Sequence, residues 1–547
     1  MEHHWYKNIV IYTIDVKTFY DSNGDGIGDL KGVISKLDYL NDLGVTCIWL
    51  LPFFPSPLKD NGYDVTNYFD VDPRLGTLED FHDLVRKVSE RGIHVVIDLV
   101  MNHTSDEHPW FLAAKNDSQS IFKDYYVWTE IPPPKDPLDT PAFPDSEHGL
   151  WKFEKTARAY YYHKFYSFQP DLQIANPTVR EEIKKVMDFW ISQGVSGFRL
   201  DAAPIMIKKK GLERTRPSNS HEIICEMRKF LKKRREGSIL LGEVDVDGTE
   251  LIDYFANGGG LQLVFNFLLN AYLIGAITEE KAETLVRGWR ELPIIPDSGN
   301  WVNFLRNLDE LNINQLPASE KKIVFDLLAP DKNMQVYGRG IRRRLASMLQ
   351  GNKKRIEMAQ SLLFSLPGTP MIVYGDEIGM GENLDLWERE SVRTPMQWDD
   401  SKNAGFSECE TAKLYRPLVK DPDFHCKKIN VAAQLKDEES LLNKIKKLIY
   451  VRKIHPEIGH GRIAWVSTND PGVLGHICHW KNDMLLAVHN LASRKAEVVL
   501  DLRTVYAKKL KNILGSCEAI PLEDGNYRIN LAAYEYAWFS VHYEKGE

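Results

Sequence analysis

The chain has little cysteine for its length and none of the cysteine spacings that hold a metal. Its 547 residues include six cysteines, and no two of them form a C-x-x-C pair. Zinc sites and disulfide frameworks both depend on such closely spaced cysteines. We therefore expect neither a structural zinc ion nor a disulfide-stapled fold.

Excess positive charge and long apolar runs are missing as well. The 69 Lys and Arg residues face 77 Asp and Glu residues, which gives a net charge of −8. This charge gives no electrostatic reason to expect nucleic acid or an anionic membrane as a partner. No apolar stretch has transmembrane length, and the first residues lack the basic region and hydrophobic run of a signal peptide. We expect a soluble protein of the cytosol that binds neither nucleic acid nor membrane.

Apolar strand-like runs alternate with amphipathic helical stretches along most of the chain. The eight strand-like runs lie at 9–16, 47–51, 94–100, 195–201, 239–243, 263–267, 302–309 and 371–374. Eight strands with intervening helices predict an α/β fold, the (β/α)8 TIM barrel, whose chemistry lies at the C-terminal ends of its strands. A doubly wound open sheet is the alternative, but no G-x-G-x-x-G motif follows the first run.

Two segments depart from this alternation. The stretch 103–171 is rich in proline and aromatic residues and is too long for an ordinary loop, so it predicts an inserted subdomain after strand 3. After about residue 455, short alternating runs predict a C-terminal antiparallel β-sandwich. We therefore divide the chain into a first barrel part (1–102), the inserted subdomain (103–171), a second barrel part (172–454) with a cap-like segment at about 311–351, and the sandwich (455–547).

Acidic residues end three of the strand-like runs. Asp201 follows Gly197-Phe-Arg-Leu, Glu243 follows Ile239-Leu-Leu-Gly, and Asp309 ends the run that begins at Val302. A lone Arg-x-Asp sequence such as Arg199-Leu-Asp201 fits a buried ion pair equally well. Three carboxylates delivered to the same end of a sheet are hard to explain as packing, and they predict a catalytic cluster at the barrel mouth.

Five motifs in chain order resemble those of the α-amylase family of glycoside hydrolases and transglycosylases, and the resemblance covers essentially the whole chain. They are Asp98-Leu-Val-Met-Asn-His103, Gln169-Pro-Asp-Leu172, Gly197-Phe-Arg-Leu-Asp201, Gly242-Glu243 and Asn307-Leu-Asp309. Further strings, such as Asn61-Gly-Tyr-Asp64 and Arg393-Thr-Pro-Met-Gln-Trp398, are most similar to the branch that isomerises maltose to trehalose. The resemblance implies retaining chemistry on an α-glucoside disaccharide.

The resemblance also implies a role for each acidic residue. Asp201 matches the nucleophile that forms a covalent glucosyl intermediate, and Glu243 matches the general acid/base. A retaining mechanism needs this pair about 5–5.5 Å apart, with the pKa of the acid held up. Asp309 matches the third acid, which binds sugar hydroxyls and distorts the ring toward the transition state.

Five further residues match substrate-binding positions of the family. Arg199 would supply positive charge beside the nucleophile. Asp64 and Arg393 match a salt-bridged pair that holds the nonreducing glucose. His103 matches a hydrogen-bond donor to the sugar's primary hydroxyl, and Tyr63 matches a stacking platform.

The chain departs from the family pattern at Leu308, where the family has a histidine that contacts hydroxyls of the reacting sugar. Losing one such hydrogen bond would cost on the order of 2–4 kcal/mol in the transition state. The apolar neighbour is also expected to raise the pKa of Asp309 by desolvation. The substitution leaves the triad in place and the preferred substrate open.

A glycine-rich loop carries oxygen-bearing side chains at alternate positions. Such a loop is either a solvated turn or a calcium loop, although the distal Glu of an EF-hand is not in register. The resemblance favours structural Ca²⁺, held by Asp21, Asn23, Asp25, Asp29 and the carbonyl of Ile27. Asn102 and Asp171 match a second calcium site of the family, although Asp171 is also structural in some members.

The resemblance leaves three functions open. The leading one is intramolecular transglucosylation that converts maltose to trehalose in a closed pocket that retains the released glucose. The alternative is a hydrolytic α-glucosidase, or a sucrose-acting or other α-glucoside enzyme, on the same triad. A catalytically silent homologue, like the ectodomains of amino-acid transporter subunits, tends to lose acids that this chain keeps. Family members often associate, so a homo-oligomer is consistent with the sequence.

Overall fold

Eight parallel strands close into a barrel at the centre of the molecule. The computed structural model describes residues 4–135, 139–207, 221–505, 507–523 and 525–543. Around the barrel the strands follow the order β1-β14-β10-β9-β8-β7-β3-β2. They are β1 (Ile11–Ile14), β2 (Cys47–Leu50), β3 (His94–Leu99), β7 (Gly197–Leu200), β8 (Ile239–Gly242), β9 (Leu263–Phe265), β10 (Asn300–Phe304) and β14 (Thr369–Val373). The predicted TIM barrel is confirmed, and the open doubly wound sheet is excluded because the sheet closes.

Helices surround this barrel. The longer ones are α4 (Leu78–Glu90), α6 (Pro177–Ser192), α8 (Glu222–Arg234), α10 (Phe267–Glu279), α11 (Ala282–Glu291), α14 (Lys353–Ser365) and α16 (Leu441–Ile454). In α4 the side chains of Thr77 and Asp80 form a capping box, and Phe81, Leu84 and Val88 are buried at helical spacing. The sequence therefore specifies both the start of α4 and the face that it buries.

Two predicted boundaries differ from the structure. The amphipathic pattern of 34–43 predicts one helix, but the segment contains the end of α2 (Leu30–Ser35) and all of α3 (Leu37–Leu43), with a break at Lys36. The side chain of Asp29 caps α2 at its N-terminus, so that helix begins earlier than expected. Strand β10 ends at Phe304 rather than at Asp309, and the intervening loop is held by Arg306 Nη2, which donates to the carbonyl oxygen of Asp309 at 2.8 Å.

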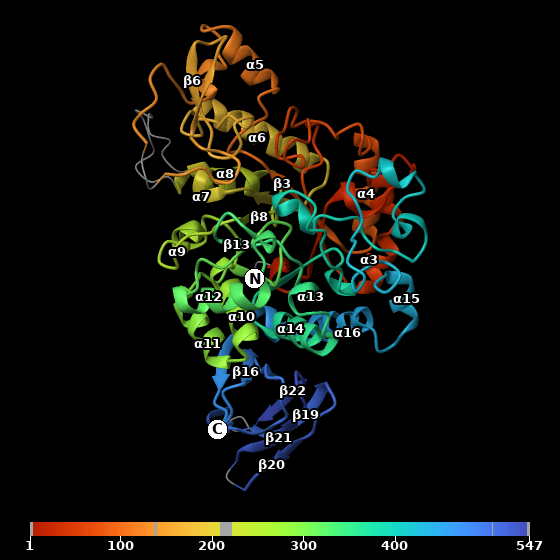
Figure 1. Ribbon diagram of the computed structural model, residues 1–547. Helices are drawn as coiled ribbons and strands as arrows, with labels where there is room; N and C mark the ends of the chain where they lie inside the picture. The colour runs from red at the N-terminus through yellow and green to blue at the C-terminus, as the bar shows by residue number, and fades with distance from the viewer. Residues whose placement is uncertain (1–3, 136–138, 208–220, 506, 524, 544–547) are drawn as a thin grey trace.

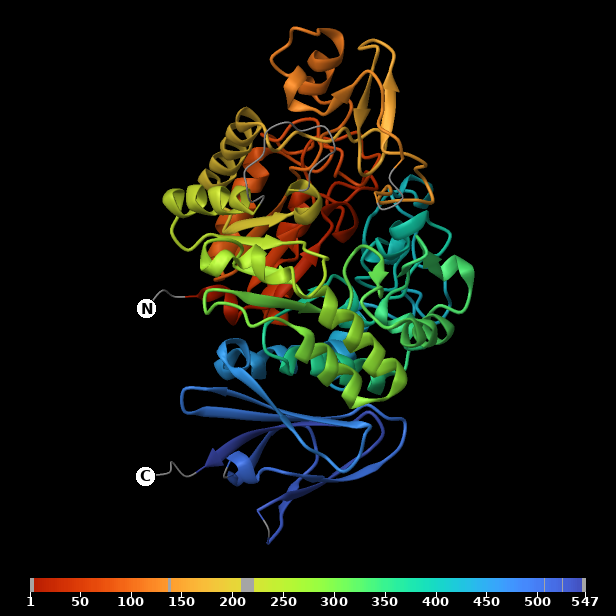
Figure 2. The same ribbon diagram turned by 90° about the vertical axis from the view of Figure 1, so that its left-hand side faces the viewer.

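Two segments lie around the mouth of the barrel. The segment 103–171 contains α5 (Pro109–Asn116) and a sheet in the order β4-β6-β5, made of β4 (Trp128–Thr129), β5 (Trp151–Glu154) and β6 (Ala159–Tyr162). The segment 311–351 contains α12 (Ala318–Leu328) and a small sheet of β11 (Leu311–Asn312), β12 (Gln335–Val336) and β13 (Gly340–Ile341). Both views show the first segment, in orange, at the end of the molecule opposite the blue C-terminal domain (Figures 1 and 2).

The C-terminal domain consists of two antiparallel sheets packed on a shared apolar core. Strands β15 (Arg462–Val466), β16 (Val473–Trp480), β17 (Asp483–Asn490), β19 (Ala507–Leu514) and β22 (Tyr536–Tyr543) form one sheet. Strands β18 (Ala496–Leu500), β20 (Ala519–Pro521) and β21 (Tyr527–Leu531) form the other. Val488, Val498 and Ile529 belong to the core between them, which confirms the predicted sandwich.

The sandwich is fastened to the barrel through α14. The indole nitrogen of Trp538 donates to Ser361 Oγ at 3.0 Å, and His489 Nε2 lies 2.9 Å from the same oxygen. Both side chains are buried. In the described ranges no helix combines the length and hydropathy that a membrane crossing requires.

Candidate active site

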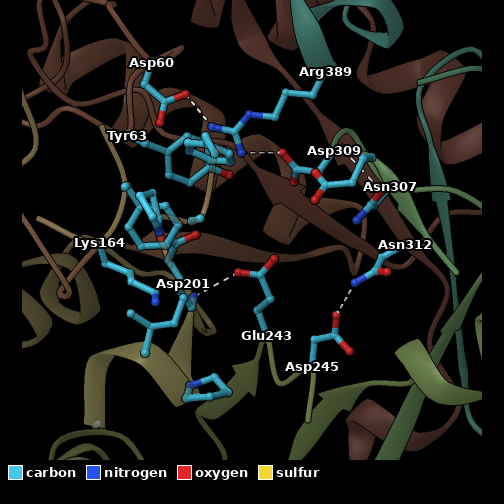
Figure 3. Close-up of a pocket in the computed structure, with 18 of the residues that line it drawn as sticks. Asp60, Tyr63, Lys164, Asp201, Glu243, Asp245, Asn307, Asp309, Asn312 and Arg389 are labelled. Atoms are coloured by element: carbon cyan, nitrogen blue, oxygen red, sulfur yellow. Dashed lines mark hydrogen bonds and ion pairs between the residues drawn. The ribbon is translucent and has the colours of Figure 1, made fainter. Parts of the chain in front are cut away.

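A cavity of about 350 Å³ opens at the mouth of the barrel (Figure 3). Its walls come from the ends of the barrel strands and from the segments 103–171 and 311–351. Six of the site residues predicted from the sequence line it, namely Tyr63, His103, Arg199, Asp201, Glu243 and Asp309. A volume of about 300–1,000 Å³ is usual for sites that bind small molecules.

The barrel places Asp201 and Glu243 beside each other. Asp201 directly follows β7, and Glu243 directly follows β8. The two strands are parallel neighbours in a register that sets Leu200 opposite Gly242. The next residue of each strand therefore emerges at the same level of the barrel mouth.

One guanidinium group holds three carboxylates at this point. Arg199 Nη1 donates to Asp98 at 2.7 Å and also to Asp201, and its Nη2 pairs with Glu243 at 2.9 Å. The Arg199 side chain is only 2% exposed. The backbone nitrogen of Ala202 adds a further hydrogen bond to Glu243 Oε2 at 2.9 Å. The planar fork of arginine makes such multiple contacts to carboxylates possible.

Two carboxyl groups of this cluster, those of Glu243 and Asp98, have a raised pKa. Burial raises the pKa of Glu243 to about 8; the charge of Arg199 opposes this rise, and the negative charges of Asp201 and Asp309 add to it. Burial likewise raises the pKa of Asp98 to about 7, again against the charge of Arg199. Glu243 is therefore mainly protonated at pH 7, as a general acid must be before it reacts.

Asp309 lies in the cavity wall among cations. Its Oδ1 accepts from Arg393 Nη2 at 2.7 Å and from Arg389 Nη1 at 2.9 Å, and the other end of the Arg389 guanidinium pairs with Asp60 at 2.5 Å. Burial pushes the pKa of Asp309 upward, but Arg393, Arg389 and Arg199 together hold it below its ordinary value. The expectation that the neighbouring Leu308 raises this pKa is therefore wrong, because three guanidinium groups outweigh the apolar surroundings.

The salt bridge across the pocket joins a different pair from the one predicted. We expected Asp64 to pair with Arg393, but Asp64 accepts hydrogen bonds from Ser56 Oγ at 2.8 Å and from the backbone nitrogens of Lys59 and Asp60 at 3.0 and 3.1 Å. Its carboxylate thus organises the turn that carries Asp60. Arg393 binds Asp309 and the carbonyl oxygen of Leu308 instead. Asp60 and Arg389 line the cavity and form the bridge, whereas Asp64 and Arg393 lie behind its wall.

Tyr63 and His103 occupy one wall of the cavity and contact each other. His103 Nε2 donates to the carbonyl oxygen of Tyr63 at 3.2 Å, and Asn102 Nδ2 lies 3.3 Å from His103 Nδ1. The guanidinium carbon of Arg199 lies 6.0 Å from the centre of the Tyr63 ring. Both predicted residues therefore reach the pocket, and their contacts with sugar stay predictions.

Leu308 does not expose its side chain to the cavity. The residue is 2% exposed, and its backbone carbonyl accepts from Arg393 Nε at 2.8 Å. The preceding residue, Asn307, lines the cavity (Figure 3).

The far side of the cavity carries polar residues that sequence reasoning missed. Asp245 accepts a hydrogen bond from Asn312 at 2.7 Å (Figure 3). It also accepts one from Gln315 at 3.1 Å, and Glu310 pairs with Arg339 at 2.8 Å. The available signal was the position of Asp245 two residues after Glu243, since alternate residues of an extended chain share a face.

The predicted calcium loop is ordered by its own hydrogen bonds. Asp21 accepts from the backbone nitrogens of Asn23, Gly24 and Gly26 at 2.7–3.1 Å, and Asp25 accepts from the backbone of Ile27 at 2.9 Å. No three His, Cys, Asp or Glu side chains in the described part of the chain are grouped so that they could hold a metal ion. The calcium ion expected at this loop stays a prediction.

Two residues of this region, Asp21 and Asp29, are nevertheless buried carboxylates. Within the described ranges no Lys or Arg pairs with either of them; Asp29 accepts from Ser22 and from Gly32 N, at the start of α2. At the second predicted site, Asn102 Nδ2 donates to Asp171 Oδ2 at 3.0 Å, so these two residues do lie together. Both calcium sites stay predictions.

Comparison with known sequences agrees with this geometry. The family model described as "Alpha amylase, catalytic domain" matches residues 11–295 and 331–461, which is more than half of the chain, and "Maltogenic Amylase, C-terminal domain" matches residues 463–538. The chain belongs to the α-amylase family. The resemblance noted in the sequence is thereby confirmed, and this α-amylase family protein carries Asp201, Glu243 and Asp309 in one cavity.

Curated relatives and a solved structure cover nearly all of the chain. It is 36% identical to a trehalose synthase of Pimelobacter sp. (strain R48), over 99% of this chain and 96% of that protein. It is 37% identical to the trehalose synthase/amylase TreS of Mycobacterium tuberculosis (strain ATCC 25618 / H37Rv), over 98% of this chain and 90% of that protein. The crystal structure of an α-amylase from H. orenii superposes with a TM-score of 0.79 at 30% identity, covering 98% of this chain and all of that one.

Proposed function

We propose that this α-amylase family protein isomerises maltose to trehalose by intramolecular transfer of a glucosyl group. The observation that carries the proposal is the bridge that Arg389 makes between Asp60 and Asp309 across the cavity, next to Asp201 and Glu243. A pocket closed by such a bridge suits an enzyme that must keep a glucose molecule between two chemical steps. The similarity to trehalose synthases over nearly the full length supports the same reaction.

The first half of the reaction breaks the glycosidic bond of maltose. A carboxylate oxygen of Asp201 attacks the anomeric carbon of the nonreducing glucose, and Glu243 gives its proton to the departing oxygen. The products of this step are a glucosyl ester on Asp201 and a free glucose molecule. Arg199 and the Ala202 backbone nitrogen lie where they hold the two carboxyl groups in place throughout.

The second half rebuilds a bond at a different hydroxyl. Glu243, now ionised, takes the proton from the anomeric hydroxyl of the released glucose, and that oxygen attacks the anomeric carbon of the ester. The bond to Asp201 breaks, and trehalose forms with the original configuration at the transferred glucosyl carbon. For this to happen the released glucose must turn inside the pocket before water reaches the ester. The polar wall of Asp245, Asn312 and Arg339 offers hydrogen-bonding groups for that glucose.

An isotope-trapping experiment tests the intramolecular route. The enzyme is given unlabelled maltose together with an excess of ¹³C-labelled glucose, and the label in trehalose is measured by mass spectrometry. We expect trehalose that is almost free of label. Label in one half of most trehalose molecules would instead show that the acceptor glucose comes from solution.

Hydrolysis of α-glucosides is the second candidate function. It is favoured by Leu308, because the family histidine that contacts the reacting sugar is replaced by an apolar side chain that does not reach the cavity. A substrate held less firmly at this point leaves more room for water, and a different α-glucoside such as sucrose then becomes a plausible donor. The retained acids argue against a catalytically silent homologue.

Structural calcium, a cytosolic location and self-association complete the proposal. The support for calcium is the burial of Asp21 and Asp29, for which the described residues supply no cationic partner. The small molecule that we propose this protein binds is an α-glucoside disaccharide. The acidic net charge of −8 supports the view that neither nucleic acid nor an anionic membrane binds.

A further inference from the structure

The buried carboxylate of Glu388, beside the active-site cavity, accepts hydrogen bonds from three hydroxyl groups. Its Oε2 accepts from Tyr337 at 2.5 Å and from Tyr166 at 2.7 Å, and its Oε1 accepts from Ser146. Glu388 is 5% exposed, and no Lys or Arg within the described ranges forms an ion pair with it. We call these four residues the Glu388 node. A buried carboxyl group whose hydrogen bonds come from hydroxyl donors loses stabilisation when any one of these donors is removed.

The donors of the Glu388 node come from two separate segments that flank the cavity. Ser146 and Tyr166 belong to the segment 103–171, and Tyr337 belongs to the cap-like segment 311–351. Phe143 packs between the two tyrosines, with ring centroids 4.6 Å from Tyr166 and 5.2 Å from Tyr337. The node therefore ties both segments to the loop that follows β14.

The same loop carries the arginine of the salt bridge in the cavity wall. Arg389 is the next residue after Glu388, and it pairs with Asp60 and Asp309 while its guanidinium lies 4.5 Å from the centre of the Phe143 ring. A shift of Glu388 must therefore move the backbone that positions Arg389. Phe143 therefore contacts both tyrosines of the node and also the guanidinium group of Arg389.

Two residues of the node have backbone conformations that residues with a side chain seldom adopt. Glu388 has φ of 41° and Tyr337 has φ of 56°, both in the left-handed region that residues with a side chain seldom adopt. Such conformations persist where surrounding contacts determine them, and they are frequent at functional sites. The hydrogen bonds of the node are the contacts that connect these two residues directly.

We propose that Glu388 is a positioning residue that locks the segments 103–171 and 311–351 over the cavity and sets Arg389 across Asp60 and Asp309. Through this lock it decides how long the released glucose is retained, and so how the glucosyl–Asp201 ester divides between isomerisation and hydrolysis. The effect of Glu388 on how the ester divides between isomerisation and hydrolysis rests on the proposed function. The effect of Glu388 on the position of Arg389 does not depend on that function.

Substitutions that remove hydroxyls one at a time test the lock with little change in packing. The variants are Tyr166→Phe, Tyr337→Phe and the double variant, with Tyr160→Phe as a matched control, since Tyr160 lies in the same inserted segment and neither contacts Glu388 nor lines the cavity. Glu388→Ala removes the acceptor entirely. Glu388→Gln keeps an amide oxygen for the tyrosines and an amide nitrogen for Ser146, so it should restore much of what Glu388→Ala loses.

Two readouts are measured on each variant. The first is the share of consumed maltose that appears as glucose, which does not depend on how much of the enzyme is folded, because both products arise from one ester. The second is the inhibition constant of glucose against hydrolysis of 4-nitrophenyl α-D-glucoside. We expect both values to rise by about tenfold in Glu388→Ala, which loses all three hydrogen bonds of the node, and in the double tyrosine variant, which loses two of them. Glu388→Gln and the single variants should lie between these and the wild type.

The outcomes separate the two proposals. If the wild type makes only glucose from maltose, the proposed isomerase function is wrong. The inhibition constant of glucose is then the one readout that tests the positioning role of Glu388. If neither readout changes in the double tyrosine variant while Tyr160→Phe also behaves as wild type, the node is not a positioning device. If Glu388→Ala fails to fold, the tyrosine variants still test whether the node positions Arg389. Effects of Glu388→Gln and Tyr337→Phe that simply add would also contradict one shared node.

Discussion

Replacing Arg199 gives the sharpest test of how the carboxylate cluster works. Arg199→Met removes the charge that Asp98, Asp201 and Glu243 share, and Arg199→Lys keeps the charge but loses the fork that reaches all three. Removing one partner of a buried ion pair costs about 3–5 kcal/mol, because the remaining charges stay buried. If that loss falls mainly on the transition state, kcat/KM for Arg199→Met falls by a factor of about 10³, since each 1.4 kcal/mol is roughly tenfold.

The pH dependence separates the charge of Arg199 from its shape. Without the cation, the carboxylate cluster loses the charge that opposes the rise of the pKa of Asp98 and Glu243, so the acidic limb of the kcat/KM profile should move up by about 1–3 pH units in Arg199→Met. In Arg199→Lys the limb should stay near its wild-type position while kcat/KM drops by about tenfold to a hundredfold. The assay is hydrolysis of 4-nitrophenyl α-D-glucoside from pH 4 to pH 9. An unshifted limb in Arg199→Met would refute the role assigned to the guanidinium.

Stability should respond to the same change with a defined sign. The pKa of Asp98 is raised to about 7 in the folded protein, so folding favours its protonated form. Its contribution to stability is greatest below the unfolded-state pKa and is lost as the pH rises through the folded-state value. Because Arg199 opposes this rise, Arg199→Met should lose unfolding free energy between pH 5 and pH 8 more steeply than the wild type in urea titrations.

Three further predictions follow from the site. The pKa of Glu243, raised to about 8, should make kcat/KM fall above about pH 8, and Glu243→Gln should abolish this alkaline limb while losing less activity on 4-nitrophenyl α-D-glucoside than on maltose. Asp60→Asn weakens the bridge to Arg389 and should raise KM for maltose by about tenfold with a smaller change in kcat; an unchanged KM would mean that the bridge does not hold the sugar. If Ca²⁺ binds at Asp21, removing it with EDTA should lower the melting temperature, and added calcium should restore it. The unfolding free energy should gain about 2.7 kcal/mol at a calcium concentration near 100 times Kd. Identical melting curves would exclude the site.

The replacement of the family histidine by Leu308 is open to a direct experiment as well. Because the Leu308 side chain is buried, Leu308→His costs stability if the imidazole stays in that apolar site, and it should raise turnover of maltose only if the ring turns into the cavity. Kinetics on maltose and sucrose, with a thermal melt as the folding control, would show this. A fall in turnover with an unchanged melt would mean that the pocket is shaped for a different contact.

The barrel and its three acids could be predicted because they depend on local patterns. Asp201 and Glu243 each follow a short apolar run, and the closed barrel then brings the ends of β7 and β8 together. Residues in loops were harder to predict, because their partners are distant in sequence. Asp60 and Arg389 are 329 residues apart, and nothing in the periodicity of either segment indicates that they meet.

The incorrect predictions have physical causes that the sequence does not display. Asp64 is a buried acid near a pocket, but three local donors satisfy it, so it needs no arginine. The pKa of Asp309 was expected to rise beside an apolar neighbour, yet Arg389 and Arg393 lower it from other parts of the chain. The acid at position 309 also lies beyond the end of β10, because an arginine-held loop rather than the strand delivers it.

A time course of products from maltose tests the central claim most directly. Purified enzyme is incubated with maltose alone, and maltose, trehalose and glucose are separated and quantified until the mixture stops changing. The account predicts that trehalose is the main product, that glucose stays a small fraction throughout, and that trehalose supplied alone returns the same mixture. Glucose as the main product from the earliest time points, with no trehalose, would contradict it and identify the protein as a hydrolase.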